Sequence, residues 1–145
     1  MMPAKISMLL SASILLTLGA MHLSLTFRGT GRTPRDPALQ ASMNTTSPVL
    51  TNETTMARCW TGFNATHSMA LILFGLIYGY LALAQSQLLF RSPFLLLVGL
   101  ATLTSLVLLC KLYFFRSPLI GVSIALFCYV ASVALSWVEP HFTKA

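Results

Sequence analysis

Charge is scarce in this sequence. Only 8% of its 145 residues are charged, and three of these are acidic. Soluble domains carry about a quarter charged residues, so a chain that is 56% hydrophobic cannot cover a water-facing surface with so few. Together with a mean hydropathy of +0.78, this scarcity excludes an ordinary soluble domain and indicates an integral membrane protein whose first partner is the lipid bilayer.

Basic stripes and paired cysteines are also missing. The formal net charge is +6, but the basic residues stand singly beside apolar runs, as cations at the ends of membrane spans do. Nucleic acid is therefore not an expected partner. Cys59, Cys110 and Cys128 form no Cys-x-x-Cys pair and no disulfide framework. Cys59 alone lies in polar sequence.

Four apolar runs are long enough to cross a bilayer, which takes about 20 residues. We predict an all-α fold, a four-helix transmembrane bundle forming one membrane domain, with a long polar loop between helices 1 and 2. The first run also resembles a signal peptide, but its length and the large Leu18 near the would-be cleavage site favour a retained span. The predicted spans are residues 6–27, 62–84, 94–115 and 119–137, and the polar loop is residues 28–59.

Helix-start signals refine these boundaries. Asp36 before a proline predicts a short interfacial helix over residues 37–43 inside the loop. The second long helix is expected to extend back as far as Asn52. The tetrapeptide Phe-Arg-Ser-Pro occurs at residues 90–93 and again at 115–118. At each copy it predicts a Ser cap followed by Pro at the first helical position, with the last two spans forming an antiparallel hairpin.

Small residues recur at helical spacing in three spans, and such faces let membrane helices approach closely. They predict a compact bundle, and they also suit a homo-oligomer or another membrane partner. The three predicted faces are Ser13, Thr17, Ala20 and Ser24 in the first span, Ser68, Gly75, Gly79 and Ala82 in the second, and Gly121, Ala125, Cys128, Ser132 and Ser136 in the fourth.

A polar cluster is expected beneath the long loop. His22 lies near the end of the first span, and His67 near the start of the second. Consecutive spans run antiparallel, so the two imidazoles should lie at the same depth. Trp60 and Asn64 share one helix face with His67. We predict a ligand-binding site at His22, His67, Asn64, Trp60 and Ser68, within a layer that also holds Ser24, Thr26 and Thr66.

Several chemistries fit such a layer, because ionisable residues inside a membrane mark functional sites. The leading interpretation is binding of a small apolar or lipid-like ligand, or of a partner. The alternatives are an enzyme using His22 and His67 on a lipid or sterol-like substrate, and a structural subunit of a membrane assembly. Two His can also hold haem or a metal, but no Cys-x-x-Cys-His occurs, and a metal would need a third ligand from Asp36 or Glu53. The cofactor stays unknown and catalysis stays uncertain.

Three short motifs within residues 15–85 resemble those of a known protein family. The chain has Gly-x-x-His-Leu at Gly19 to Leu23, Pro-Arg-Asp at Pro34 to Asp36 with Met43, and Trp-x-Gly-Phe-Asn-x-Thr-His-Ser at Trp60 to Ser68. It thereby resembles an uncharacterised bacterial four-span membrane protein family, which implies four helices and a bacterial inner-membrane location but no activity. In architecture alone it is similar to the DoxX-like proteins and the sterol isomerases, whose catalytic carboxylates are missing here.

Orientation stays open. Arg28, Arg35 and most other basic residues fall on the side of the long loop, which favours a cytoplasmic loop, whereas Lys5 beside the N-terminal amine is an ordinary start for a cytoplasmic N-terminus. Lys111 lies inside the third span, and we expect its ammonium to reach the interface by snorkelling.

Overall fold

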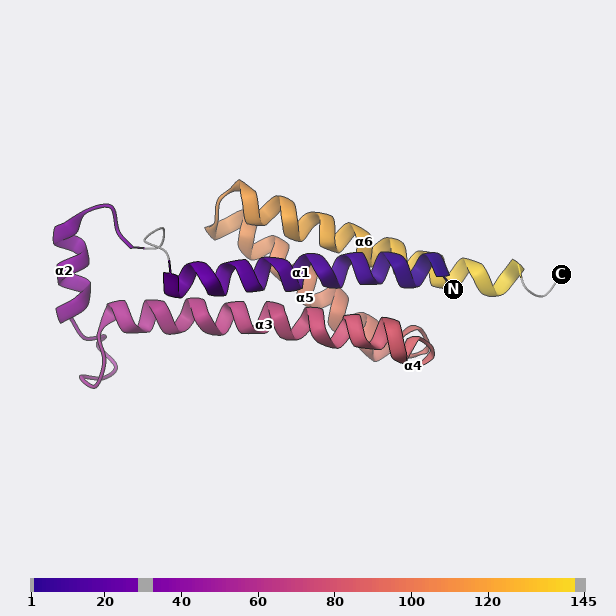
Figure 1. Ribbon diagram of the computed structural model, residues 1–145, viewed down its shortest axis with the longest axis horizontal. Helices are drawn as coiled ribbons and strands as arrows, with labels where there is room; N and C mark the ends of the chain where they lie inside the picture. Colours follow the sequence, from indigo (N-terminus) through magenta and orange to yellow (C-terminus); the bar gives the residue numbers. More distant parts are fainter. Residues whose placement is uncertain (1, 29–32, 143–145) are drawn as a thin grey trace. The chain divides into compact units, whose positions relative to one another are not determined.

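The computed structural model describes residues 2–28 and 33–142, with side chains described as far as Val138. Among these residues it contains helices and no strand (Figure 1). The elements are α1 (Met2–Arg28), α2 (Pro37–Thr45), α3 (Met56–Ala84), α4 (Ser86–Arg91), α5 (Pro93–Tyr113) and α6 (Arg116–Phe142).

Four of these helices are long and apolar enough to cross a membrane: α1, α3, α5, and α6 from Arg116 to Val138. The all-α prediction is confirmed, and each predicted span coincides with one of these long apolar helices. Several helices extend beyond the apolar runs: α1 begins at Met2 and α3 at Met56, a few residues before the predicted span starts.

The chain divides into two compact units. The bundle unit comprises Met1–Leu18 and Ile72–Ala145, and the loop unit comprises Gly19–Leu71. All four long helices contribute to the bundle unit. The loop unit holds the second part of α1, all of α2 and the first part of α3.

A seam of serine hydroxyls joins α1 to α6 in the bundle unit. Each hydroxyl donates to a backbone carbonyl of the other helix, which satisfies a polar group that lipid cannot satisfy. The partners show that the two helices run antiparallel. The bonds run from Ser7 to the Cys128 carbonyl (2.8 Å), from Ser11 to that of Ala125 (2.8 Å), and from Ser132 to that of Ala4 (2.6 Å).

The small-residue faces of the second and fourth spans do face other helices. A Cβ added at Gly75 would lie 2.7 Å from the Ala12 carbonyl oxygen of α1, so only glycine permits this approach. On α6, a Cβ added at Gly121 would lie 3.0 Å from the Leu18 side chain. The predicted contribution of small residues to helix packing is confirmed for these two spans.

The small-residue face predicted for the first span is wrong. Ser13, Thr17, Ala20 and Ser24 are all exposed. α1 instead buries a stripe of mixed size, because serines on that stripe bond to α6 and its larger side chains fill the space between helices. The buried stripe includes Ala4, Met8, Ser11, Ala12 and Leu15.

Tyr129 links the α5–α6 hairpin. Its hydroxyl donates to the Leu96 carbonyl at 2.9 Å, and its ring packs on Gly99, where any Cβ would overlap it. Tyr78 of α3 lies edge-on to Tyr129, with ring centroids 5.9 Å apart, and donates to the Leu95 carbonyl at 2.7 Å. The predicted hairpin is confirmed, and two tyrosines tie its N-terminal half to the rest of the bundle unit.

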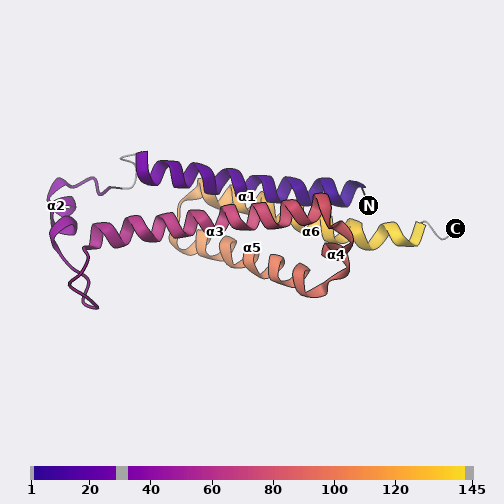
Figure 2. The ribbon, with the colours of Figure 1, turned by 60° about the horizontal axis from the view of Figure 1, so that its bottom comes forward.

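Of the two predicted Ser-Pro helix starts, one is confirmed and the other is wrong. The Ser92 hydroxyl accepts a bond from the Leu95 amide at 3.4 Å, and Pro93 opens α5 as predicted. At the second copy, α6 begins at Arg116, so Pro118 is its third residue and not its first. Proline fits there because amides in the first helical turn have no intrahelical partner. The short helix α4, between α3 and α5 (Figure 2), was not predicted.

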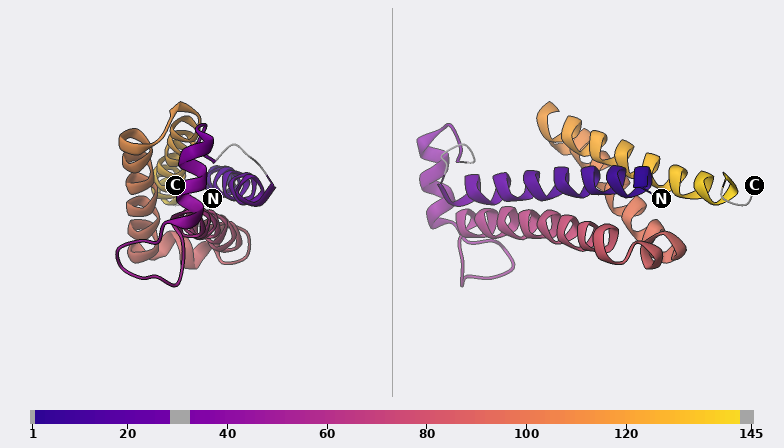
Figure 3. Two further views of the ribbon diagram at one scale, coloured as in Figure 1. Left: turned by 90° about the vertical axis from the view of Figure 1, so that its left-hand side faces the viewer. Right: turned by 45° about the vertical axis from the view of Figure 1, so that its right-hand side comes forward.

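The loop unit confirms the short helix in the polar segment. α2 begins at Pro37, and its N-cap Asp36 accepts a bond from the Ala38 amide at 2.9 Å. Figure 3 shows α2 running across the ends of the parts of α1 and α3 that belong to this unit. α3 begins at Met56, so the expected extension to Asn52 is wrong and Glu53 lies outside the helix. Cys59 is exposed, but it lies in the first turn of α3 and not in the loop.

Candidate functional site

The two imidazoles meet in the loop unit. His22 comes from the last part of α1 and His67 from α3, and their ring centroids are 5.3 Å apart in an edge-to-face arrangement with an interplanar angle of 72°. Both residues are half-buried. The predicted geometry, two rings at one depth on antiparallel helices, is confirmed. That they bind a ligand stays a prediction.

Asn64 joins the pair through its amide. Its Nδ2 donates to the Trp60 carbonyl at 2.8 Å, and its Oδ1 lies 3.1 Å from His22 Nε2. A carbonyl can only accept, so the amide nitrogen must face Trp60 and the amide oxygen must face His22. His22 Nε2 therefore carries the proton, and in a neutral ring Nδ1 is the acceptor. Asn64 is only 6% exposed, so it fixes the tautomer from within the helix pair.

The other predicted site residues differ in access. Ser68 is fully buried, and its hydroxyl donates to the Asn64 carbonyl at 2.8 Å within α3. Trp60 is 45% exposed, one helical turn before Asn64. The structure thus brings His67 and Asn64 to His22. Trp60 and Ser68 instead adjoin Asn64 along α3.

Of the other residues predicted for the polar layer, only Thr26 bonds to a residue of the imidazole cluster. Thr26 donates to the His22 carbonyl at 2.8 Å, one turn further along α1. Ser24 is exposed, and Thr66 is exposed and donates to the Phe63 carbonyl at 3.0 Å. Neighbours in a helix point about 100° apart, so Thr66 cannot share the face of His67.

Within the described residues, no group of three or more His, Cys, Asp and Glu side chains is placed to hold a metal ion. Asp36, one of the two proposed third ligands, caps α2 instead. Glu53, the other, is exposed in the segment before α3. The third ligand that sequence reasoning required does not reach the imidazole pair in the described part of the chain.

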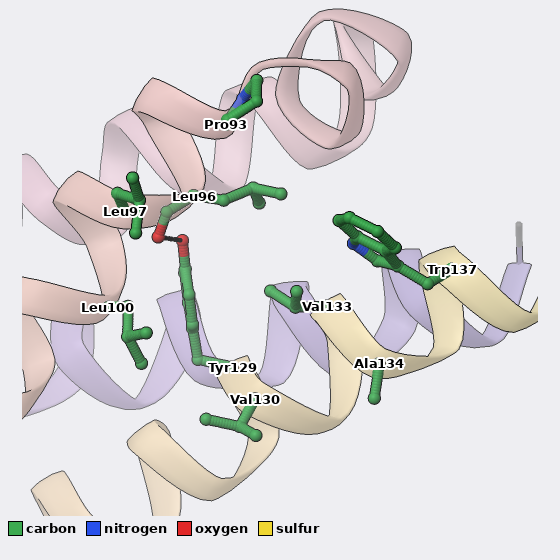
Figure 4. Close-up of a pocket in the computed structure, with 9 residues that line it drawn as sticks. All are labelled: Pro93, Leu96, Leu97, Leu100, Tyr129, Val130, Val133, Ala134 and Trp137. Carbon is green, nitrogen blue, oxygen red and sulfur yellow. Dashed lines mark hydrogen bonds between the residues drawn. The ribbon is translucent and has the colours of Figure 1, made fainter.

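A feature that sequence reasoning missed lies in the bundle unit. An apolar groove of about 540 Å³ lies between α5 and α6 (Figure 4). Apolar residues in a groove and apolar residues facing lipid are of the same types, so composition carried no signal for it. It is lined by Pro93, Leu96, Leu97, Leu100, Tyr129, Val130, Val133, Ala134 and Trp137.

The fold and the site together define an all-α integral membrane protein with four candidate spans and a polar cluster on its first two long helices. In comparisons with known proteins, no family model, no curated protein and no solved structure matches the chain.

Proposed function

We propose that this protein binds an amphipathic, lipid-like ligand in the membrane through the His22–Asn64–His67 cluster. The observation that carries the proposal is the contact between two imidazoles from different spans, with one ring held in a defined tautomer by a buried amide. A lipid-like ligand supplies both a polar group for the rings and an apolar tail for the surrounding helices.

The cost of polar groups in lipid supports this proposal. Imidazoles and amides within apolar helices are unfavourable unless they are paired, and such residues usually serve a site. Asn64 is paired on both sides of its amide. His22 and His67 are each half-buried, and the proposal is that a ligand hydroxyl, carbonyl or phosphate reaches the pair from the side that the two helices leave uncovered.

The surroundings fit the ligand class. Trp60 exposes nearly half of its surface beside the cluster, and tryptophan favours the level of lipid headgroups. Arg58 is exposed in the first turn of α3, on the headgroup side of His67. The resemblance to the bacterial four-span family leads us to propose the bacterial inner membrane as the location.

A second candidate is a subunit of a larger membrane assembly. It is favoured by the exposed small-residue face of α1, Ser13, Thr17, Ala20 and Ser24, which suits close packing by a further helix. An enzyme acting on a lipid remains the third candidate, with His22 or His67 as the proton-transferring group.

The test is gentle purification of the full chain, followed by an absorbance spectrum and native mass spectrometry of the bound molecule. We expect the parent protein to retain a lipid-like molecule. We expect His22→Phe and His67→Phe each to lower its occupancy about tenfold, because a lost hydrogen bond at a desolvated site costs about 1–2 kcal/mol.

The matched control is Thr66→Ala, which removes an exposed hydroxyl next to His67 on another face of α3. It should leave occupancy unchanged. If nothing accompanies the parent, and both His variants change only thermal stability, the ligand proposal fails. A Soret band in the parent would instead favour haem.

A further inference from the structure

We infer a second lipid site, in the bundle unit, where a glycerophospholipid with an anionic headgroup places one acyl chain in the α5–α6 groove and its phosphate at Arg91. The groove and a smaller polar pocket adjoin along the chain: Pro93 lines the groove, and Ser92 lines the pocket. The site is separate from the His22–Asn64–His67 cluster and does not depend on it.

The groove has the form of a slot for one chain. Tyr129 crosses the groove from α6 to α5, and Pro93 and Trp137 stand at one end of it, beyond the Tyr129 ring (Figure 4). Pro93 and Leu100 are about 10 Å apart along α5, at about 1.5 Å per residue. That depth is about a third of the hydrocarbon core, so an acyl chain of one leaflet fills the groove from its headgroup end.

The rim of the groove is accessible to lipid. Trp137 is 69% exposed and Leu97 is 64% exposed. α5 and α6 are both candidate membrane spans, so acyl chains are the medium around them. Trp137 and Phe94, which is 72% exposed, lie at the same end of the hairpin, as aromatic residues at the membrane interface do.

The pocket supplies the charge for a headgroup. It has a volume of about 310 Å³ and is lined by Gln87, Leu88, Arg91 and Ser92. Arg91 is the one charged side chain among the residues lining either the pocket or the groove. A guanidinium binds a phosphate through two parallel hydrogen bonds, and the Gln87 amide can add another.

The charge balance of the bundle unit favours an anionic lipid. Its described charged side chains are all basic: Lys5 and Arg91 lie toward the end of the unit where α5 begins, and Lys111 and Arg116 lie at the opposite end. Glu139, the acidic residue of this part of the sequence, lies outside the described side chains. A headgroup with net negative charge is therefore preferred to a zwitterionic one of the same chain length.

The two tryptophans make the test direct. Replacing Trp60 by Phe leaves Trp137 as the only indole in the chain, and lipids brominated on the acyl chain quench an indole that they touch. We expect brominated phosphatidylglycerol to quench Trp137 at about fivefold lower concentration than brominated phosphatidylcholine. That ratio corresponds to one basic residue at an anionic surface, worth about 1 kcal/mol.

Matched variants distinguish binding at Arg91 from general electrostatic attraction between the basic protein and anionic lipid. Arg91→Gln should abolish the preference for phosphatidylglycerol, whereas Arg116→Gln, at the hairpin turn of the same unit, should keep it. Ala134→Phe fills the groove and should weaken quenching by both lipids. Equal quenching of Trp137 by the two lipids in the Trp60→Phe protein overturns the inference, as does equal loss of preference in both arginine variants. A Trp137 that neither lipid quenches shows that a protein partner covers the groove, and also overturns it.

Discussion

Gly99 and Tyr129 show how one missing side chain shapes the hairpin. A Cβ at Gly99 would lie 2.6 Å from the Tyr129 Cζ, far inside van der Waals contact. Because glycine leaves this space open, the Tyr129 ring reaches across to α5 and its hydroxyl bonds the Leu96 carbonyl. That bond satisfies the hydroxyl of a side chain that is 0% exposed.

We predict that Gly99→Ala lowers the free energy of unfolding by about 1–3 kcal/mol, the usual cost of overpacking, because Tyr129 must move and lose its bond. Unfolding in mixed detergent micelles measures it. The control is Gly62→Ala, since nothing lies within 4 Å of a Cβ there. Ala is favoured over Gly in a helix by about 1 kcal/mol, so Gly62→Ala should be neutral or stabilising. Equal losses at the two glycines would contradict this account of the hairpin.

At the scale of elements, serine hydroxyls join α1 to α6. The serines of the seam are 0% exposed at Ser11 and Ser132, and each bonds a carbonyl of the opposite helix. Helices in lipid lack a hydrophobic drive toward one another, so close packing and such bonds hold them together.

We predict that Ser11→Ala with Ser132→Ala lowers the free energy of unfolding by about 1 kcal/mol, since interhelical bonds in membranes average about 0.6 kcal/mol each. Thermal unfolding of the purified protein measures the change. Ser13→Ala is the matched control, because Ser13 is exposed on another face of α1, and it should leave stability unaltered. A seam variant as stable as the parent would show that shape alone holds α1 to α6.

The element scale also shows where sequence reasoning stops. Apolar run length was enough to predict four helices, and Asp36-Pro37 was enough to predict α2. The contact face of α1 could not be predicted, because small and polar residues occur on two sides of that helix and only the position of α6 selects one. α4 was missed because it is a short run with Leu and Phe, and no Gly or Pro before it marks where α3 ends.

At the scale of the whole molecule, the imidazole cluster lies in the loop unit, whereas the serine seam and the two tyrosine bonds lie in the bundle unit. The polar cluster could be predicted, because equal depth follows from antiparallel spans and a helix face follows from residue spacing. The burial of each residue in the cluster could not be predicted. Asn64 and Ser68 are buried, whereas His22 and His67 are half-buried, and this difference depends on how the two helices are rotated about their axes.

The most direct measurement is cross-linking of His22→Cys with His67→Cys in membranes, after replacement of the three native cysteines. The control pair is Ala20→Cys with Met69→Cys. Each lies two residues from its histidine in opposite directions, so antiparallel helices put this pair at the same depth, but both positions are exposed. We predict that a short thiol-reactive cross-linker joins positions 22 and 67 and fails to join 20 and 69. Efficient linking of the control pair, with none between 22 and 67, would contradict the imidazole pair and the binding site built on it.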